Sequence, residues 1–256
     1  MLRKFLPVLG ALLLTASLVS AQRNCGAMEV LDRQLQEDPA MQERMNAIEN
    51  HAQHFAQNPG AHDRVVVTIP VVVNVVYNTT SENISEAQIM SQIDVLNADF
   101  RLLNADQSLI PQIFQGVKAD CEVQFCLATQ DPNGNATTGI RRQATSLTSF
   151  SSNDAMKYTS QGGLDGWDRN KYLNLWVCDL GGGLLGYAQF PGGPAATDGV
   201  VCDYAYFGTT GVATPPFDKG RTATHEVGHW LNLRHIWGDA NCGSDLVNDT
   251  PVHNTS

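Results

Sequence analysis

The chain is poor in basic residues. Its 256 residues include 16 Lys and Arg against 26 Asp and Glu, which gives a formal net charge of −10 at pH 7. Nucleic-acid binding depends on clustered Lys and Arg that neutralise phosphates. We therefore expect no nucleic-acid partner, and we interpret the acidity as favouring solubility.

Long apolar runs are absent after the first segment. A membrane-spanning helix needs roughly 18 or more consecutive apolar residues, and no later stretch provides them. Residues 1–21 have the three parts of a secretory signal peptide: basic Arg3 and Lys4, an apolar stretch through Leu14, and small residues up to Ala21. We therefore expect cleavage after Ala21, a secreted and extracellular protein, and no membrane anchor.

Paired cysteine motifs are also lacking, although the chain contains six cysteines. None of their spacings is that of a zinc ribbon or of a CxxC redox pair. Cysteines in an exported chain are typical of disulfide bonds, because the compartment is oxidising. We expect disulfide bonds within the set Cys25, Cys121, Cys126, Cys178, Cys202 and Cys242.

Residues 22–64 form a charged segment that differs from the rest of the chain. Asp38 and Pro39 have the order of a helix N-cap followed by a first-turn proline. Apolar residues then recur every three or four positions, which predicts an amphipathic helix (Met41, Met45, Ile48, Ala52 and Phe55). The segment is interpreted as a pro-segment that is later removed. The alternative is an N-terminal helical hairpin that stays on the mature protein.

Residues 65–256 alternate between expected strands and helices. Strands are expected at residues 65–77, 122–128, 172–179, 184–190 and 199–206. Ser85 begins a capping box, and the helix after it has Ile89, Ile93, Leu96 and Phe100 at helical spacing. A second helix is expected at residues 222–233. This order predicts an α/β or α+β domain with a mixed, twisted sheet.

A metal-binding pattern lies in the second of these helices. His225 and His229 are four residues apart, so they share one face of a helix. Glu226, next to the first histidine, is placed to act as general base on a water bound to the metal. His235 would be a third ligand, and zinc in catalytic sites typically has three protein ligands and an open position. We therefore predict a zinc site with Glu226 as its catalytic residue.

The chain must leave the helix between His229 and His235, because a residue six positions further along a helix points away. In the long form of this motif a glycine stands three residues after the second histidine. Here the residue is Asn232. Asn tolerates the left-handed conformation better than other non-glycine residues, so we expect Asn232 to adopt it.

The run HEVGHWLNLRHIWGD, residues 225–239, resembles the metzincin metallopeptidases, and within them the cytophagalysin-like members of the pappalysin family. Residues 173–177, 181–194, 198–201 and 249–251 also resemble blocks of that family, as does Cys25-Gly26 with the segment behind it. The resemblance implies a backing helix, an active-site helix, and a strand at residues 184–190 that pairs antiparallel with an extended peptide substrate.

Three further expectations come from the resemblance. Asp245 and Asp249 lie where related enzymes bind structural calcium, although a solvated acidic loop is the alternative. Cys25 lies where related zymogens place an inhibitory cysteine on the zinc, and the alternative for it is a disulfide partner. Cys242 would pair with a cysteine further downstream, which leaves three connectivities for the remaining four cysteines (Cys121, Cys126, Cys178 and Cys202).

The family also has a methionine-containing turn and a helical subdomain after the third histidine. The sequence ends at Ser256, and its last methionine is Met156. The catalytic domain is thus expected to be C-terminally truncated, to bind zinc, and to have weak or no peptidase activity as given.

The leading hypothesis is a secreted zinc endopeptidase made as a zymogen and cut near residues 62–64. The main alternative is a truncated, inactive zinc-binding module that captures extended peptides. A metallohydrolase acting on a non-peptide bond is a third hypothesis, which the extended-strand architecture disfavours.

Overall fold

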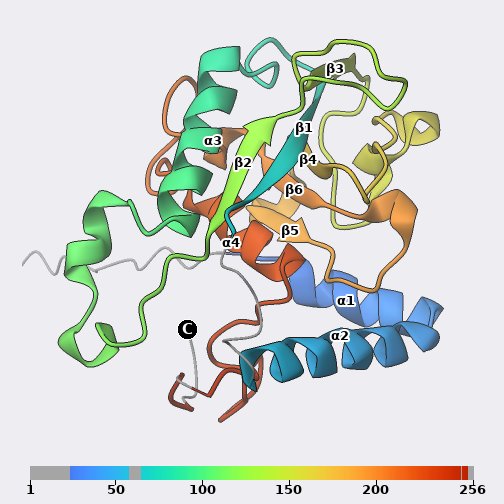
Figure 1. The fold of residues 1–256 in the computed structure, drawn as a ribbon. Coiled ribbons are helices and arrows are strands. Elements are labelled where there is room, and N and C mark those ends of the chain that lie inside the picture. Colours follow the sequence, from blue (N-terminus) through green and yellow to red (C-terminus); the bar gives the residue numbers. More distant parts are fainter. Residues whose placement is uncertain (1–23, 58–64, 249, 253–256) are drawn as a thin grey trace, which may run out of the picture.

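The computed structural model describes residues 24–57, 65–248 and 250–252. Its centre is a six-stranded mixed sheet with the strand order β2-β1-β4-β6-β5, and β3 also pairs with β1 (Figure 1). All pairs are parallel except β5 with β6, which is antiparallel. The strands are β1 Val67–Tyr77, β2 Val123–Leu127, β3 Ile140–Ala144, β4 Leu173–Cys178, β5 Gly186–Ala188 and β6 Val200–Asp203. The predicted mixed α/β class is confirmed.

Strand β1 forms the centre of the core because its β-branched residues are buried on both faces of the sheet. Val71, Val73 and Val75 contribute to the core on one face. Val72 and Val76 pack into separate clusters on the other face. Since side chains alternate along a strand, this near-continuous apolar run indicates a strand covered on both sides.

Helices α3 (Glu86–Phe100) and α4 (Arg221–Trp230) cover one face. The Ser85 side chain caps α3 by accepting from the Gln88 amide at 3.1 Å, as its capping box predicts. Both helices contribute to the same apolar cluster as β1, β4 and β6. Helix α3 is thus the expected backing helix, and α4 is held between it and the edge of the sheet.

Helices α1 (Ala27–Glu37) and α2 (Ala40–Gln57) lie beside the β5 edge of the sheet (Figure 1). Ala27, Leu31, Met41 and Met45 share a cluster with Phe190, just beyond β5. Helix α2 begins at Ala40, and the Ala40 amide donates to the Asp38 side chain at 3.1 Å. Residues 27–57 are therefore mostly helical, and they pack against the sheet rather than standing apart from it.

Several predicted elements are shorter in the structure. The strand expected at residues 199–206 ends at Asp203, because the Asp203 side chain accepts from the Ala205 amide and starts a 3-10 turn. The helix expected to reach residue 233 ends at Trp230. The 3-10 helices are Ala105–Leu109, Gln112–Phe114, Ala155–Lys157, Thr159–Gln161, Gly181–Gly183, Ala195–Thr197 and Tyr204–Tyr206.

The expected disulfide bonds are not present in this structure, which has no disulfide bond among the six cysteines. Cys178 and Cys202 are buried on the neighbouring strands β4 and β6. They belong to clusters on opposite faces of the sheet, because Cys202 pairs in register with Val177. Adjacent residues on a strand point to opposite faces, so these two thiols cannot meet.

Within the described residues, no helix is long and apolar enough to cross a membrane. The expected signal peptide, the expected cleavage region at residues 62–64 and Asp249 lie outside the described residues.

Candidate metal centre

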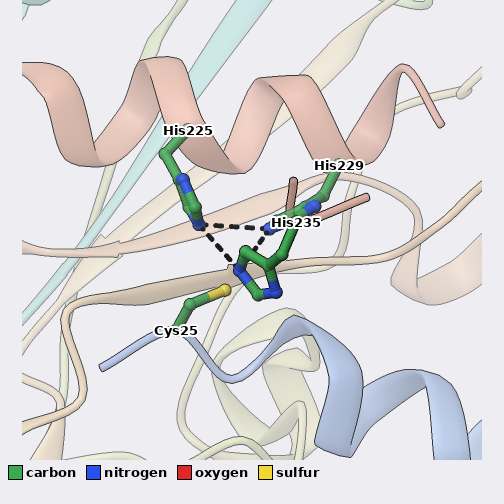
Figure 2. A group of neighbouring side chains, drawn as sticks. All are labelled: Cys25, His225, His229 and His235. Carbon is green, nitrogen blue, oxygen red and sulfur yellow. Dashed lines mark hydrogen bonds between the residues drawn. The ribbon is translucent and has the colours of Figure 1, made fainter. Parts of the chain in front are cut away.

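Three histidines meet beside helix α4 (Figure 2). His225 and His229 come from α4, one helical turn apart, and their Nε2 atoms are 3.1 Å apart. His235 comes from the chain beyond the helix, and its Nε2 is 3.2 Å from the Nε2 atoms of both His225 and His229. The structure therefore brings together all three histidines that the sequence predicted as ligands.

The spacing of these nitrogens suits a single zinc ion. Zn–N bonds of about 2.0–2.1 Å in a tetrahedron place the nitrogens roughly 3.3–3.4 Å from one another. The observed separations of 3.1 to 3.2 Å are close to that value. Three imidazole nitrogens at mutual contact cannot all donate and accept hydrogen bonds in one triangle, so a shared cation explains the arrangement better.

Outer contacts set the tautomers of two of the rings. His229 Nδ1 lies 2.7 Å from the Leu233 carbonyl oxygen, so this nitrogen must donate. His235 Nδ1 lies 2.6 Å from Asp239 Oδ1 and donates to that carboxylate. Both rings therefore present the Nε2 lone pair to the centre. Metal-binding histidines typically have such outer partners, which also fix the ring orientation.

The turn that brings His235 back is built as its sequence predicts. Asn232 has a φ of 76°, in the left-handed region. The Asn232 amide donates to the His229 carbonyl, and the Leu233 amide donates to the Gly228 carbonyl, both at 2.9 Å. The Asn232 side chain also donates to Glu49 of α2 at 3.2 Å, so the N-terminal segment contacts this turn.

Burial keeps the second histidine neutral. His229 is 3% exposed, and burial lowers its pKa to about 4. A histidine must be neutral to bind a metal, because the proton and the ion compete for the same nitrogen. The ring is thus ready to bind at neutral pH.

Glu226 lies beside the histidines and is 1% exposed. The residue facing it on β5 is Gly186, where a Cβ would stand 3.1 Å from Glu226 Cγ and 2.8 Å from the Val201 carbonyl oxygen. The close approach of β5 to α4 therefore requires glycine at this position. This glycine lets the Glu226 side chain lie directly against β5.

Cys25 completes the group. Its Sγ and the three histidine nitrogens all lie within 4.8 Å of one another (Figure 2). The thiol donates to Glu226 Oε2 at 3.5 Å. Burial, and then the negative charge of Glu226, raise the pKa of the thiol. A bound cation would act in the opposite direction and deprotonate the thiol.

The backbone around Cys25 occupies the edge of β5. Gly26 N donates to Gly186 O, and Leu185 N donates to Asn24 O, both at 3.0 Å. The bridge between Cys25 and Gly186 is parallel. A cavity of about 900 Å³ adjoins the group, with Met28, Phe100 and Leu233 among its apolar lining residues.

Asp245 is not part of this centre. It is buried, and its Oδ1 accepts from the Val247 amide at 3.0 Å. In the described part of the chain, the one group of possible metal ligands is Cys25 with the three histidines. Calcium binding by Asp245 and Asp249 stays a prediction.

The sequence predicts no role for Asp239, whose carboxylate accepts a hydrogen bond from His235 in the structure. The signal that could have identified it is its position four residues after a predicted ligand.

Replacing Asp239 with Asn is expected to weaken zinc binding about 10- to 100-fold, because loss of an outer carboxylate frees the His235 ring to reorient. Competition with a chromophoric chelator measures this. Asp131→Asn, in an exposed loop, is the control; equal affinities for the two variants would contradict the role.

Comparison with known proteins gives consistent matches. The profile of the Peptidase M43 family, described as "Pregnancy-associated plasma protein-A", matches residues 157–256. A protein named extracellular metalloprotease from Pyricularia oryzae is 30% identical over 259 residues, which span 98% of this chain and 77% of that protein. Its namesake from Verticillium alfalfae is 28% identical over 257 residues, 97% of this chain and 78% of that protein.

Solved structures match as well. Mature mirolysin of Tannerella forsythia, in complex with a cleaved peptide, is 53% identical with a TM-score of 0.72, covering 74% of this chain and 73% of that one. A mutant of Tannerella forsythia promirolysin is 45% identical with a TM-score of 0.77, covering 91% of this chain and 77% of that one.

Proposed function

The chain belongs to the pappalysin family (Peptidase M43) of metalloproteases, and from this premise we propose that it is a secreted zinc endopeptidase made in a latent form. The observation that supports this best is the meeting of three histidine Nε2 atoms within 3.2 Å of one another, beside the buried Glu226. Relatives named extracellular support secretion.

His225, His229 and His235 would hold the zinc. When bound, the ion would lower the pKa of a coordinated water to about 7 and polarise the scissile carbonyl. Glu226 would accept the proton of the attacking water and deliver it to the leaving nitrogen as general base and acid. Its burial beside Gly186 would hold the carboxylate in place for both transfers.

The edge of β5 would bind the substrate backbone. Leu185 N and Gly186 O are the donor and acceptor that residues 24–26 now occupy. An extended peptide paired antiparallel with this strand would use the same groups, and such main-chain pairing gives affinity for many sequences. We call β5 the rim strand from here on.

The latent form would be maintained by residues 22–64, which we call the N-terminal segment. We propose residues 1–21 as signal peptide, residues 22–64 as pro-segment and residues 65–256 as catalytic domain. The match to promirolysin covers 91% of this chain and the match to mature mirolysin covers 74%, which supports a removable segment of about this size. Cys25 would fill the zinc position that the attacking water needs.

Loss of the thiol gives a direct test of this latency. In the full chain loaded with cobalt in place of zinc, Cys25 is expected to produce a thiolate-to-metal charge-transfer band, because thiolates are good ligands for both ions. Cys25→Ser is expected to abolish the band and to raise the peptidase activity of the unprocessed chain. Cys126→Ser, an exposed thiol on β2, is the control. A band that survives in Cys25→Ser would contradict the role of Cys25 as a ligand.

A further inference from the structure

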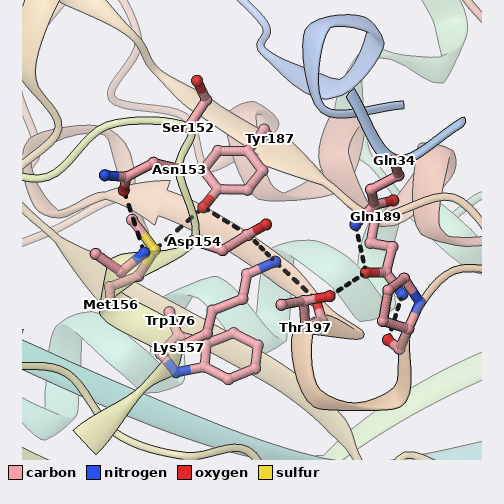
Figure 3. A network of polar contacts seen from close by, with 12 residues as sticks. Gln34, Ser152, Asn153, Asp154, Met156, Lys157, Trp176, Tyr187, Gln189 and Thr197 are labelled. Carbon is pink, nitrogen blue, oxygen red and sulfur yellow. Dashed lines mark hydrogen bonds and ion pairs between the residues drawn. The ribbon is translucent and has the colours of Figure 1, made fainter. Parts of the chain in front are cut away.

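A buried polar network centred on Asp154 includes Tyr187 of the rim strand (Figure 3). Asp154 Oδ1 accepts from the Tyr187 hydroxyl at 3.0 Å and from Lys157 Nζ at 2.8 Å. Lys157 is fully buried, and its Nζ also donates to the Thr197 carbonyl at 2.7 Å. These contacts fix the carboxylate in one orientation.

The second oxygen of this carboxylate contacts the N-terminal segment. Arg33 of α1 donates from Nη2 to Asp154 Oδ2 at 2.6 Å and from Nη1 to the Ser152 carbonyl. The Asp154 side chain is 6% exposed, whereas that of Arg33 is 31% exposed. One planar guanidinium therefore bridges a buried carboxylate oxygen and a main-chain oxygen. A lysine ammonium, which is a point donor, matches such a pair less well.

Removal of the N-terminal segment would leave this pair of acceptors without its donors. Lys157 would remain on Asp154 Oδ1, but Oδ2 and the Ser152 carbonyl would lose Arg33. The 6% exposure of the Asp154 side chain is reached with Arg33 in place, so removal of the segment would open both acceptors to solvent, while Lys157 and Tyr187 would keep the carboxylate oriented. The pair is thus a preformed site for a guanidinium group.

The network lies on the path of a peptide bound to the rim strand. The N-terminal segment runs parallel to β5, because Cys25 is bridged to Gly186 and Gln34 Nε2 donates to Gln189 Oε1 at 2.8 Å. Arg33 is next to Gln34 in the chain, so it lies near the end of β5 that leads to Gln189. A substrate paired antiparallel with β5 would place there the residues that precede its scissile bond. Gly186 and Gln189 are three positions apart along the chain, which is about 10 Å in a strand.

We propose that Asp154 and the Ser152 carbonyl form a guanidinium-binding subsite of the active enzyme, which takes an arginine about three to five residues before the scissile bond. Arg33 fills this subsite in the latent chain. The proposal rests on the proposed function in one respect, namely that the N-terminal segment leaves and a peptide takes its place along the rim strand.

The first experiment needs no peptidase activity. Arg33→Ala in the full chain opens the subsite, and binding of N-acetyl-arginine amide is followed by NMR titration, with the citrulline and lysine amides as neutral and non-planar probes. The arginine amide is expected to bind this variant at least about tenfold more tightly than the citrulline amide, since charge-assisted hydrogen bonds exceed neutral ones. The wild-type chain should show no such preference. Equal binding of both amides to Arg33→Ala would overturn the proposal.

Two further variants separate recognition from folding. Asp154→Asn alone leaves Lys157 buried without its counter-ion, so Asp154→Asn is combined with Lys157→Met and Arg33→Ala. This variant is expected to lose the preference for the arginine amide. Asp165→Asn combined with Arg33→Ala is the matched control, because Asp165 bonds to Thr159 outside the network, and it should keep the preference. Retention of the preference without Asp154 would also overturn the proposal.

The second experiment tests the role in catalysis. Peptides that differ only at the fourth residue before the scissile bond, arginine or citrulline, are compared by kcat/KM with the processed enzyme. The arginine peptide is expected to be favoured about tenfold, and the preference is expected to disappear in Asp154→Asn/Lys157→Met. Cleavage of both peptides at equal rates would refute the subsite but not the proposed function. Cleavage of neither would refute the proposed function, and the binding result would still decide the subsite.

Discussion

In the processed enzyme, replacement of Glu226 by Gln is expected to lower kcat/KM for peptide hydrolysis by about a hundredfold to ten-thousandfold while zinc stays bound. The amide keeps the shape of the side chain that packs against Gly186, where an added Cβ would stand 3.1 Å from Glu226 Cγ. It cannot accept the proton of the attacking water. Because the side chain is not one of the three imidazoles, the metal content should be unchanged.

Steady-state kinetics on a fluorogenic peptide, together with metal analysis of the same samples, measure both quantities. Glu86→Gln, at the exposed start of α3, is the matched control and should behave like the unaltered protein. Turnover by Glu226→Gln within a few-fold of the unaltered protein would refute its role as the base.

Replacement of His229 by Ala is expected to weaken zinc binding by more than about a hundredfold, which is the upper range for losing only an outer partner of a ligand. The loss of zinc should also lower the peptidase activity of this variant below detection. His229 is firmly placed for the proposed role as a ligand, because its Nε2 lies 3.1 to 3.2 Å from those of His225 and His235 and its Nδ1 donates to the Leu233 carbonyl.

Zinc affinity is measured by chelator competition, with thermal unfolding to confirm that the variant is folded. His51→Ala is the control, since His51 lies exposed on α2. Unchanged zinc affinity in His229→Ala would show that the metal, if bound, lies elsewhere.

Residues 24–57 contact the rest of the chain at more places than the proposed metal site. Cys25 lies beside the histidines, residues 24–26 use the edge of the rim strand, and Arg33 and Gln34 bond behind it. The N-terminal segment thus covers the proposed metal site, the edge of the rim strand and the proposed guanidinium subsite. Each of these positions is one that a substrate would need, so removal of the segment would expose all three together.

The local parts of the site could be predicted from the sequence because their physics is local. The spacing of His225 and His229 follows from the helical repeat, and the left-handed Asn232 follows from the need to turn before His235. The cap at Ser85 is equally local. These elements depend on residues within one or two turns of each other.

The distant contacts could not be predicted in this way. Arg33 and Asp154 are 121 positions apart, and no periodicity links them. The pairing of the cysteines could not be predicted for a similar reason. Counting cysteines ignores strand register, and only the pairing of Val177 with Cys202 shows that Cys178 and Cys202 face opposite sides of the sheet.

X-ray absorption at the zinc edge of the purified full chain tests the central claim most directly. The latent zinc centre should show three nitrogen ligands at about 2.0–2.1 Å and one sulfur ligand at about 2.3 Å, with one zinc per chain. A zinc shell made of oxygens without sulfur, or a chain that takes up no zinc, would contradict it.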